Sequence, residues 1–199
     1  TLSEFNNPIS RGIIAIGLAE GDELVGAHLT KGDNYIFLAT RNGKAIRFSE
    51  TDVRPMGRPA RGVRGIKLAE DDYVIDMEAV REGDLILSIS EKGYGKRTPV
   101  EQYRVTARGG KGVINMKTPP RVGKVATVLA VRDDDDVIII TRQGQLIRIE
   151  AAEIRKCGRG ASGVRLVKLE NEDTVAAACV VQEERQEEEE TSQAALPLQ

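Results

Sequence analysis

What the sequence lacks narrows the classes of function that it can have. The chain of 199 residues contains no tryptophan, 4% aromatic residues, one histidine and two cysteines. So few aromatics argue against single-stranded nucleic-acid binding by base stacking, and the missing Trp-Asp pair argues against WD40-type blades. His28 has no metal-ligand cluster around it, and Cys157 and Cys179 lack metal-site or redox-motif spacing. We therefore expect reduced thiols, a cytoplasmic location and no bound metal.

Long apolar runs are absent as well. No stretch approaches the roughly 18 consecutive apolar residues of a membrane span, and no secretory signal opens the chain. The sequence begins with Thr1 and not with methionine, so we expect it to be a piece of a longer polypeptide.

The formal net charge of −2 conceals an uneven distribution of charge. Residues 182–199 hold six glutamates and one arginine. The remaining 28 basic and 25 acidic side chains give the rest of the chain a net charge of +3. A core-poor acidic segment beside a mildly basic body predicts a folded domain over residues 1–181 and a disordered acidic tail over residues 182–199.

The dominant feature of the sequence is a repeat of about 50 residues. Residues 40–48 read TRNGKAIRF, residues 141–149 read TRQGQLIRI, and a looser copy lies at 90–98. An apolar run precedes each copy, and a basic, glycine-containing loop followed by a second apolar stretch comes after it. The pattern predicts a partial repeat over residues 1–33 and full repeats over residues 34–83, 84–134 and 135–181.

Local sequence signals within each repeat indicate strands and tight turns. Short β-branched and aliphatic runs bounded by Asn-Gly, Lys-Gly or Gln-Gly are typical of β-hairpins. No window of 11 or more residues keeps a helical period, which excludes a helical solenoid. Repeats of this length with about four short strands each predict an all-β architecture of propeller-like blades arranged around an axis.

Four motifs are distributed along the chain: GDELVG at 21–26, GVRGIKL at 62–68, GYGKRT at 93–98 and KGVINMK at 111–117. Together they resemble the C-terminal domain of bacterial DNA gyrase A subunits, in a likeness that runs from about Glu4 to Val181. The resemblance implies a six-bladed β-pinwheel whose basic rim binds, bends and wraps duplex DNA without sequence preference. Residues 106–112 keep only the last five residues of the family's box, Gln-Arg-Arg-Gly-Gly-Lys-Gly.

The same resemblance has implications for the whole protein. It implies a type IIA topoisomerase that introduces negative supercoils by ATP hydrolysis, in the bacterial cytoplasm and associated with the nucleoid. The partners implied are duplex DNA, the remainder of the gyrase A subunit and the gyrase B subunit in a heterotetramer. The catalytic tyrosine would lie upstream, so this part of the chain would carry no catalytic residue, cofactor or metal.

Cations that recur in register are the candidate DNA-binding residues. Sequence-independent binding needs positive charges spaced along the phosphate path, and glycines beside them let the backbone come close to phosphates. We predict phosphate contacts for the glycine-loop residues Arg61, Arg64, Arg108, Lys111 and Arg159. We predict them also for two further registers: Arg54, Arg104 and Arg155, and the strand residues Arg47, Arg97 and Arg148.

Other interpretations of these features remain open at the level of sequence. The arginines could pair between blades with Glu50, Glu101 and Glu150, and the domain could belong to topoisomerase IV or serve as a protein-interaction platform. Residues 158–163 match the dinucleotide-binding pattern GxGxxG formally, but a period-2 strand pattern follows where that fingerprint needs a helix. The run Asp133–Asp136 is interpreted as a solvated turn and not as a metal site.

Overall fold

The computed structural model describes residues 2–6, 10–170 and 172–181. These residues form eleven strands in three antiparallel sheets, with short 3-10 turns and no α-helix among them. The all-β prediction is confirmed. No helix in this described part is long and apolar enough to cross a membrane. The predicted acidic tail, residues 182–199, lies outside the described residues.

The three sheets are built from strands in the following order. The first contains β3 (Val74–Val80), β1 (Tyr35–Thr40), β2 (Lys44–Ser49) and β6 (Val113–Ile114). The second contains β10 (Val164–Arg165), β5 (Tyr94–Pro99), β4 (Leu85–Ser90) and β7 (Val125–Val131). The third contains β11 (Val175–Val181), β8 (Asp136–Thr141) and β9 (Leu146–Glu150). The 3-10 turns are η1 (Leu2–Phe5), η2 (Glu50–Asp52), η3 (Val100–Gln102) and η4 (Ala151–Glu153).

Each four-stranded blade combines strands from two successive repeats. The outer strand β6 pairs with β2 through Ala45 opposite Val113, and β10 pairs with β5 through Gly95 opposite Val164. The outermost strand is thus contributed by the next repeat along the chain. The third sheet has no such strand on β9 among the residues that the structure describes.

A glycine at each hairpin turn permits this close approach. Gly43 and Gly93 have positive φ angles of 80° and 75°, which glycine adopts without steric cost. A Cβ atom on Gly43 would also collide with the carbonyl of Met116 in the following repeat, and one on Gly93 with the carbonyl of Val167. The turn glycines therefore serve both the hairpin and the exchange of strands between repeats.

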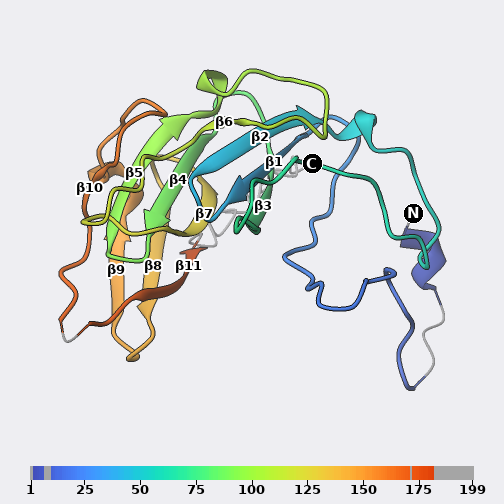
Figure 1. Ribbon diagram of the computed structural model, residues 1–199, viewed down its shortest axis with the longest axis horizontal. Helices are drawn as coiled ribbons and strands as arrows, with labels where there is room; N and C mark the ends of the chain where they lie inside the picture. The colour runs from blue at the N-terminus through green and yellow to red at the C-terminus, as the bar shows by residue number, and fades with distance from the viewer. Residues whose placement is uncertain (1, 7–9, 171, 182–199) are drawn as a thin grey trace, which may run out of the picture.

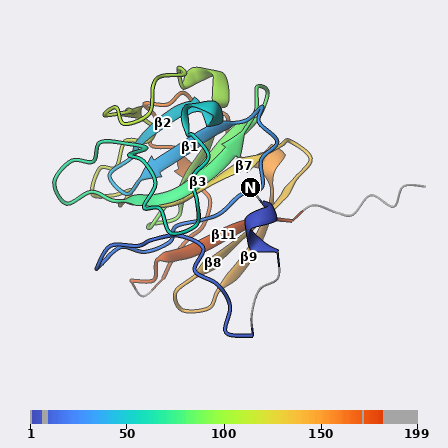
Figure 2. The same ribbon diagram turned by 90° about the vertical axis from the view of Figure 1, so that its right-hand side faces the viewer.

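The blades follow one another in chain order, and their inner strands meet. Strand β3 packs against β7, and β7 packs against β11. Figure 1 shows the sheets side by side, and Figure 2 shows β1, β2 and β3 on one side of the molecule and β8, β9 and β11 on the other. The apolar core lies between blades, where Phe37 of the first repeat meets Tyr103 of the second edge-on at 4.8 Å between ring centroids.

Candidate nucleic-acid interface

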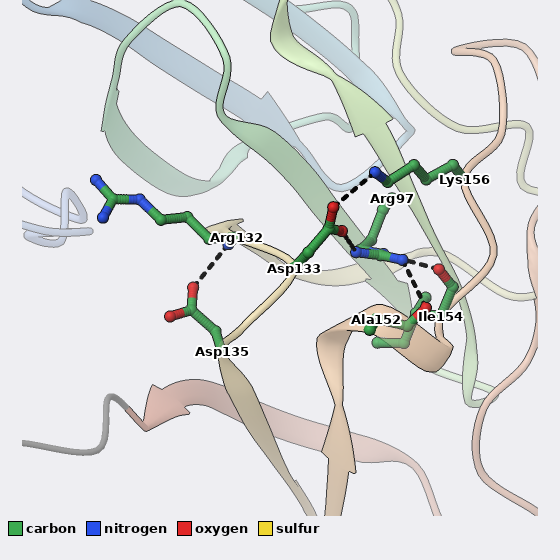
Figure 3. Close-up of polar contacts among 7 residues, drawn as sticks. All are labelled: Arg97, Arg132, Asp133, Asp135, Ala152, Ile154 and Lys156. Atoms are coloured by element: carbon green, nitrogen blue, oxygen red, sulfur yellow. Dashed lines mark hydrogen bonds and ion pairs between the residues drawn. The ribbon is translucent and has the colours of Figure 1, made fainter. Parts of the chain in front are cut away.

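Two of the predicted strand arginines are buried between blades. Arg97 on β5 donates from Nε to the carbonyl of Ile154 (2.7 Å) and from Nη2 to that of Ala152 (2.8 Å), and it pairs with Asp133 (Figure 3). Arg47 on β2 makes similar contacts: it donates from Nη1 to the carbonyls of Val100 (2.9 Å) and Tyr103 (3.3 Å) and pairs with Glu82, while its buried Nε has no partner among the described residues. Their side chains are 3% and 2% exposed. They join each blade to the next and have no surface to offer a phosphate.

The alternative of pairing with carboxylates holds for these two arginines, but with acids of their own repeats; the contacts that cross to the next repeat are the hydrogen bonds to backbone carbonyls. The partners are Glu82 and Asp133, and not Glu50 or Glu101. Arg148, the third member of the register, lies on β9, where no further strand is described. Its side chain is 55% exposed and pairs with Asp136 on the neighbouring strand.

The acidic run Asp133–Asp136 has a structural role in the same junction. Asp133 contacts both Arg97 and Lys156, the latter at 2.9 Å, and these cations lower the pKa of its carboxyl group. Asp135 accepts the backbone N–H of Arg132 at 2.7 Å (Figure 3). In the described part of the chain no three potential metal-ligating side chains form a group. The run closes a turn and neutralises a buried arginine.

The register of Arg54, Arg104 and Arg155 faces solvent. Each arginine comes two residues after a 3-10 turn, directly after a residue that packs inward, as Tyr103 and Ile154 do. All three side chains are exposed, and none makes a hydrogen bond or ion pair with another described residue. The buried neighbour fixes the backbone, and the arginine is left available.

The structure corrects the register expected within the glycine loops. Gly62, Gly112 and Gly163 are equivalent, with φ angles of 81°, 67° and 80° directly before a valine. The residue four positions before each of these glycines is an arginine: Arg58, Arg108 and Arg159. Arg58, and not Arg61, is therefore the equivalent of Arg108 and Arg159. We call these three the clasp arginines: Arg58, Arg108 and Arg159. Sequence reasoning missed Arg58 because Arg61, and not Arg58, precedes a glycine, as Arg108 and Arg159 do.

The corrected register separates two kinds of loop cation. Each clasp arginine donates a hydrogen bond from its guanidinium to a backbone carbonyl of the preceding repeat. Arg61, Arg64 and Lys111 are instead exposed, and their side chains have no hydrogen-bond or ion-pair partner among the described residues. We call the exposed cations of these registers the rim cations: Arg54, Arg61, Arg64, Arg104, Lys111 and Arg155.

A buried lysine forms hydrogen bonds with the backbone of the third glycine loop, residues 158–163. The ammonium of Lys96 on β5 donates to Thr98 Oγ1 (3.0 Å) and to the carbonyls of Gly158 (2.9 Å) and Arg159 (3.0 Å). The residue is 0% exposed, and burial lowers its pKa to about 8. The first repeat places Ile46 at this position, where it packs against Gly110. Lys96 was not predicted as a functional residue.

The lowered pKa of Lys96 predicts a pH-dependent stability. Between pH 8 and 10.5 the unfolded chain binds the proton more tightly than the folded chain does, so the free energy of unfolding should rise with pH. Urea unfolding at about pH 8 and about pH 10 should show this rise in the wild type relative to Lys96→Met. Parallel pH profiles of the two proteins would contradict the prediction.

The end of the blades that holds the hairpin turns carries charges of both signs. Arg41 pairs with Glu91 of the next repeat at 2.7 Å, and Lys124 donates to Asn42 at 2.6 Å. These residues stand at or beside the hairpin turns and the starts of the inner strands. Among the described residues this end therefore offers no register of like charge, since the position of Arg41 is occupied by Glu91 in the next repeat.

Comparisons with known proteins agree with this architecture. The family model "DNA gyrase C-terminal domain, beta-propeller" matches residues 1–31, 34–81, 84–132 and 135–181. The DNA gyrase A subunit of Haloquadratum walsbyi is 44% identical over 179 residues, which cover 89% of this chain and 21% of that protein. The DNA gyrase A subunit of Klebsiella oxytoca is 44% identical over 174 residues, covering 87% and 20%. The chain thus spans about a fifth of the length of these relatives.

Two solved structures are similar in fold. A DNA gyrase A C-terminal domain superposes with a TM-score of 0.78 at 29% identity, covering 84% of this chain and 57% of that one. The C-terminal domain of a DNA topoisomerase IV superposes with a TM-score of 0.86, covering 91% and 57%, but at 24% identity it shows the fold alone.

Proposed function

The chain belongs to the DNA gyrase C-terminal domain family, and from this premise we propose that it binds duplex DNA along its outer rim and bends it, without reading the sequence. The observation that carries the proposal is the set of rim cations: each of the three full repeats has at least one, exposed and without a side-chain partner among the described residues. Phosphate binding needs cations spaced along the duplex and little else. Arginine, the commonest residue among them, can contact a phosphate through two N–H groups at once.

The distribution of charge over the repeats suits bending better than a single basic patch would. Bending 20–30 base pairs by 40–90° costs on the order of 1–6 kcal/mol by elastic estimates. Contacts must therefore be spread along the bent path, so that each blade supplies part of the energy that holds the curve. In the whole protein the proposed role is to wrap DNA for negative supercoiling by an ATP-dependent topoisomerase. The remainder of the gyrase A subunit and the gyrase B subunit would supply the catalytic steps.

Titration with duplex DNA of random sequence tests the proposal. If the six rim cations neutralise about six phosphates, log K should fall against log salt with a slope near −5. Two duplexes of unrelated sequence and equal length should bind alike, and the matched single strand should bind more weakly because stacking aromatics are scarce. No binding at low salt, or binding with a flat salt dependence, would favour a protein-interaction platform instead.

A further inference from the structure

The clasp arginines link successive glycine loops in the same way at three junctions. Arg58 donates from Nη1 to the carbonyl of Ile14 at 3.0 Å. Arg108 does so to Arg64 at 3.1 Å, and Arg159 to Ile114 at 2.9 Å. Each bond therefore joins one repeat to the repeat before it.

A backbone hydrogen bond runs in the opposite direction at each of these junctions. The N–H groups of Gly17, Lys67 and Lys117 lie three residues beyond the carbonyls that accept from the clasp arginines. They donate to the carbonyls of Ala60 (3.2 Å), Gly110 (2.8 Å) and Ala161 (3.4 Å), which lie two residues beyond each clasp arginine. Every loop is thus tied to the one before it by a reciprocal pair of bonds.

We propose that the clasp arginines are positioning residues, which hold successive loops at a fixed spacing so that the rim cations lie along a curved path. This inference rests on the proposed function. It assigns the arginines of the glycine loops to two tasks, because Arg61 and Lys111 contact phosphates while Arg58, Arg108 and Arg159 set the distance between loops. It therefore removes Arg108 and Arg159 from the set that contacts DNA.

The hydrogen bonding of Arg108 supports this division most directly. Its Nε donates to the carbonyl of Asp52 at 3.1 Å while its Nη1 donates to Arg64, so two edges of the guanidinium are occupied by protein. Lys111, three residues later in the same loop, is exposed.

Loops rich in glycine would move easily without such ties. Stiff duplex DNA would then pull the loops apart toward a straighter path, because bending it costs energy. The hydrogen bonds between loops resist that pull, so that the bound duplex stays bent.

Charge-conserving and charge-removing variants separate the two roles. Arg108→Lys keeps the charge but cannot make both carbonyl bonds. We expect its salt slope to stay within about 0.3 of the wild type. The bend of an end-labelled duplex, measured by energy transfer in the saturated complex, should decrease. Lys111→Gln is the matched control: its slope should weaken by about 0.9, while the bend in the saturated complex stays unchanged.

Hydrogen exchange supplies a measurement that does not depend on DNA. The amide of Lys67, which donates to Gly110 at this junction, should exchange about tenfold faster in Arg108→Lys and at the wild-type rate in Lys111→Gln. If Arg108→Lys has a lower urea midpoint, and so is destabilised as a whole, Arg58→Lys repeats the test at the first junction.

The outcomes distinguish the two proposals. If Arg108→Lys changed neither the exchange rate of the Lys67 amide nor the bend of the duplex, the positioning role of the clasp arginines would be overturned. A slope weakened by about 0.9 in Arg108→Gln, with the bend retained, would overturn it too and would make Arg108 a phosphate contact. A wild-type chain that binds no duplex would overturn the proposed function and the role in bending. The exchange rates would then still decide whether the arginines tie the loops together.

Discussion

Arg97→Met is expected to lower the free energy of unfolding by about 2–4 kcal/mol, mainly because two backbone carbonyls lose their donor. The substitution removes a buried hydrogen bond to the carbonyl of Ile154, a part-buried one to that of Ala152, and the ion pair with Asp133. Carbonyls left without a donor keep their desolvation cost, about 1–3 kcal/mol each. The loss falls at the junction between the second and third repeats. Urea unfolding followed by circular dichroism should show a lower midpoint.

The chain offers its own control for this substitution. Arg148 stands at the equivalent position on β9, but its side chain is 55% exposed and pairs with Asp136 at the surface. Exposed ion pairs contribute about 0–1 kcal/mol, so Arg148→Met should cost no more than about 1 kcal/mol. Equal losses from the two substitutions would mean that Arg97 does not join the blades in the way its contacts indicate.

The hairpins could be predicted from the sequence because their signals are local. A glycine turn between two apolar runs, repeated three times, specifies β1–β2, β4–β5 and β8–β9 without knowledge of the rest of the chain. The exchange of strands could not be predicted, because β6 and β10 are two residues long and pair with a different repeat. Nothing in so short a segment identifies its distant partner.

The candidate site shows the same division between local and distant information. Arg54, Arg104 and Arg155 are exposed, as their predicted phosphate contacts require. A solvent-facing position directly after a turn is a local property. Arg47 and Arg97 were predicted to contact phosphates but are buried, because the carbonyls and acids that satisfy them come from distant segments. Lys96 gave no signal for a similar reason, since two of its three acceptors lie in the following repeat.

Removal of one complete register of rim cations is expected to have the largest effect on DNA binding. Arg54, Arg104 and Arg155 have no side-chain partner among the described residues, so their joint replacement by Gln should leave the fold intact. Each lost phosphate contact removes about 0.9 from the salt slope, so the slope should weaken from near −5 to about −2.3. With an unchanged salt-independent term, this corresponds to roughly 500-fold weaker binding at about 0.1 M salt. Fluorescence anisotropy with a labelled duplex at several salt concentrations measures both quantities.

A second triple variant with the same change of charge shows whether position or total charge decides the result. Arg132, Arg142 and Lys168 are exposed cations outside the rim registers, and their replacement by Gln also removes three positive charges. If phosphates are contacted only where cations recur along the rim, this variant should change the slope by less than about 0.5, through long-range electrostatics alone. Similar losses in the two triples would show that DNA responds to overall charge, and the rim would lose its special role. A larger loss in the control triple would place the duplex on another face of the blades.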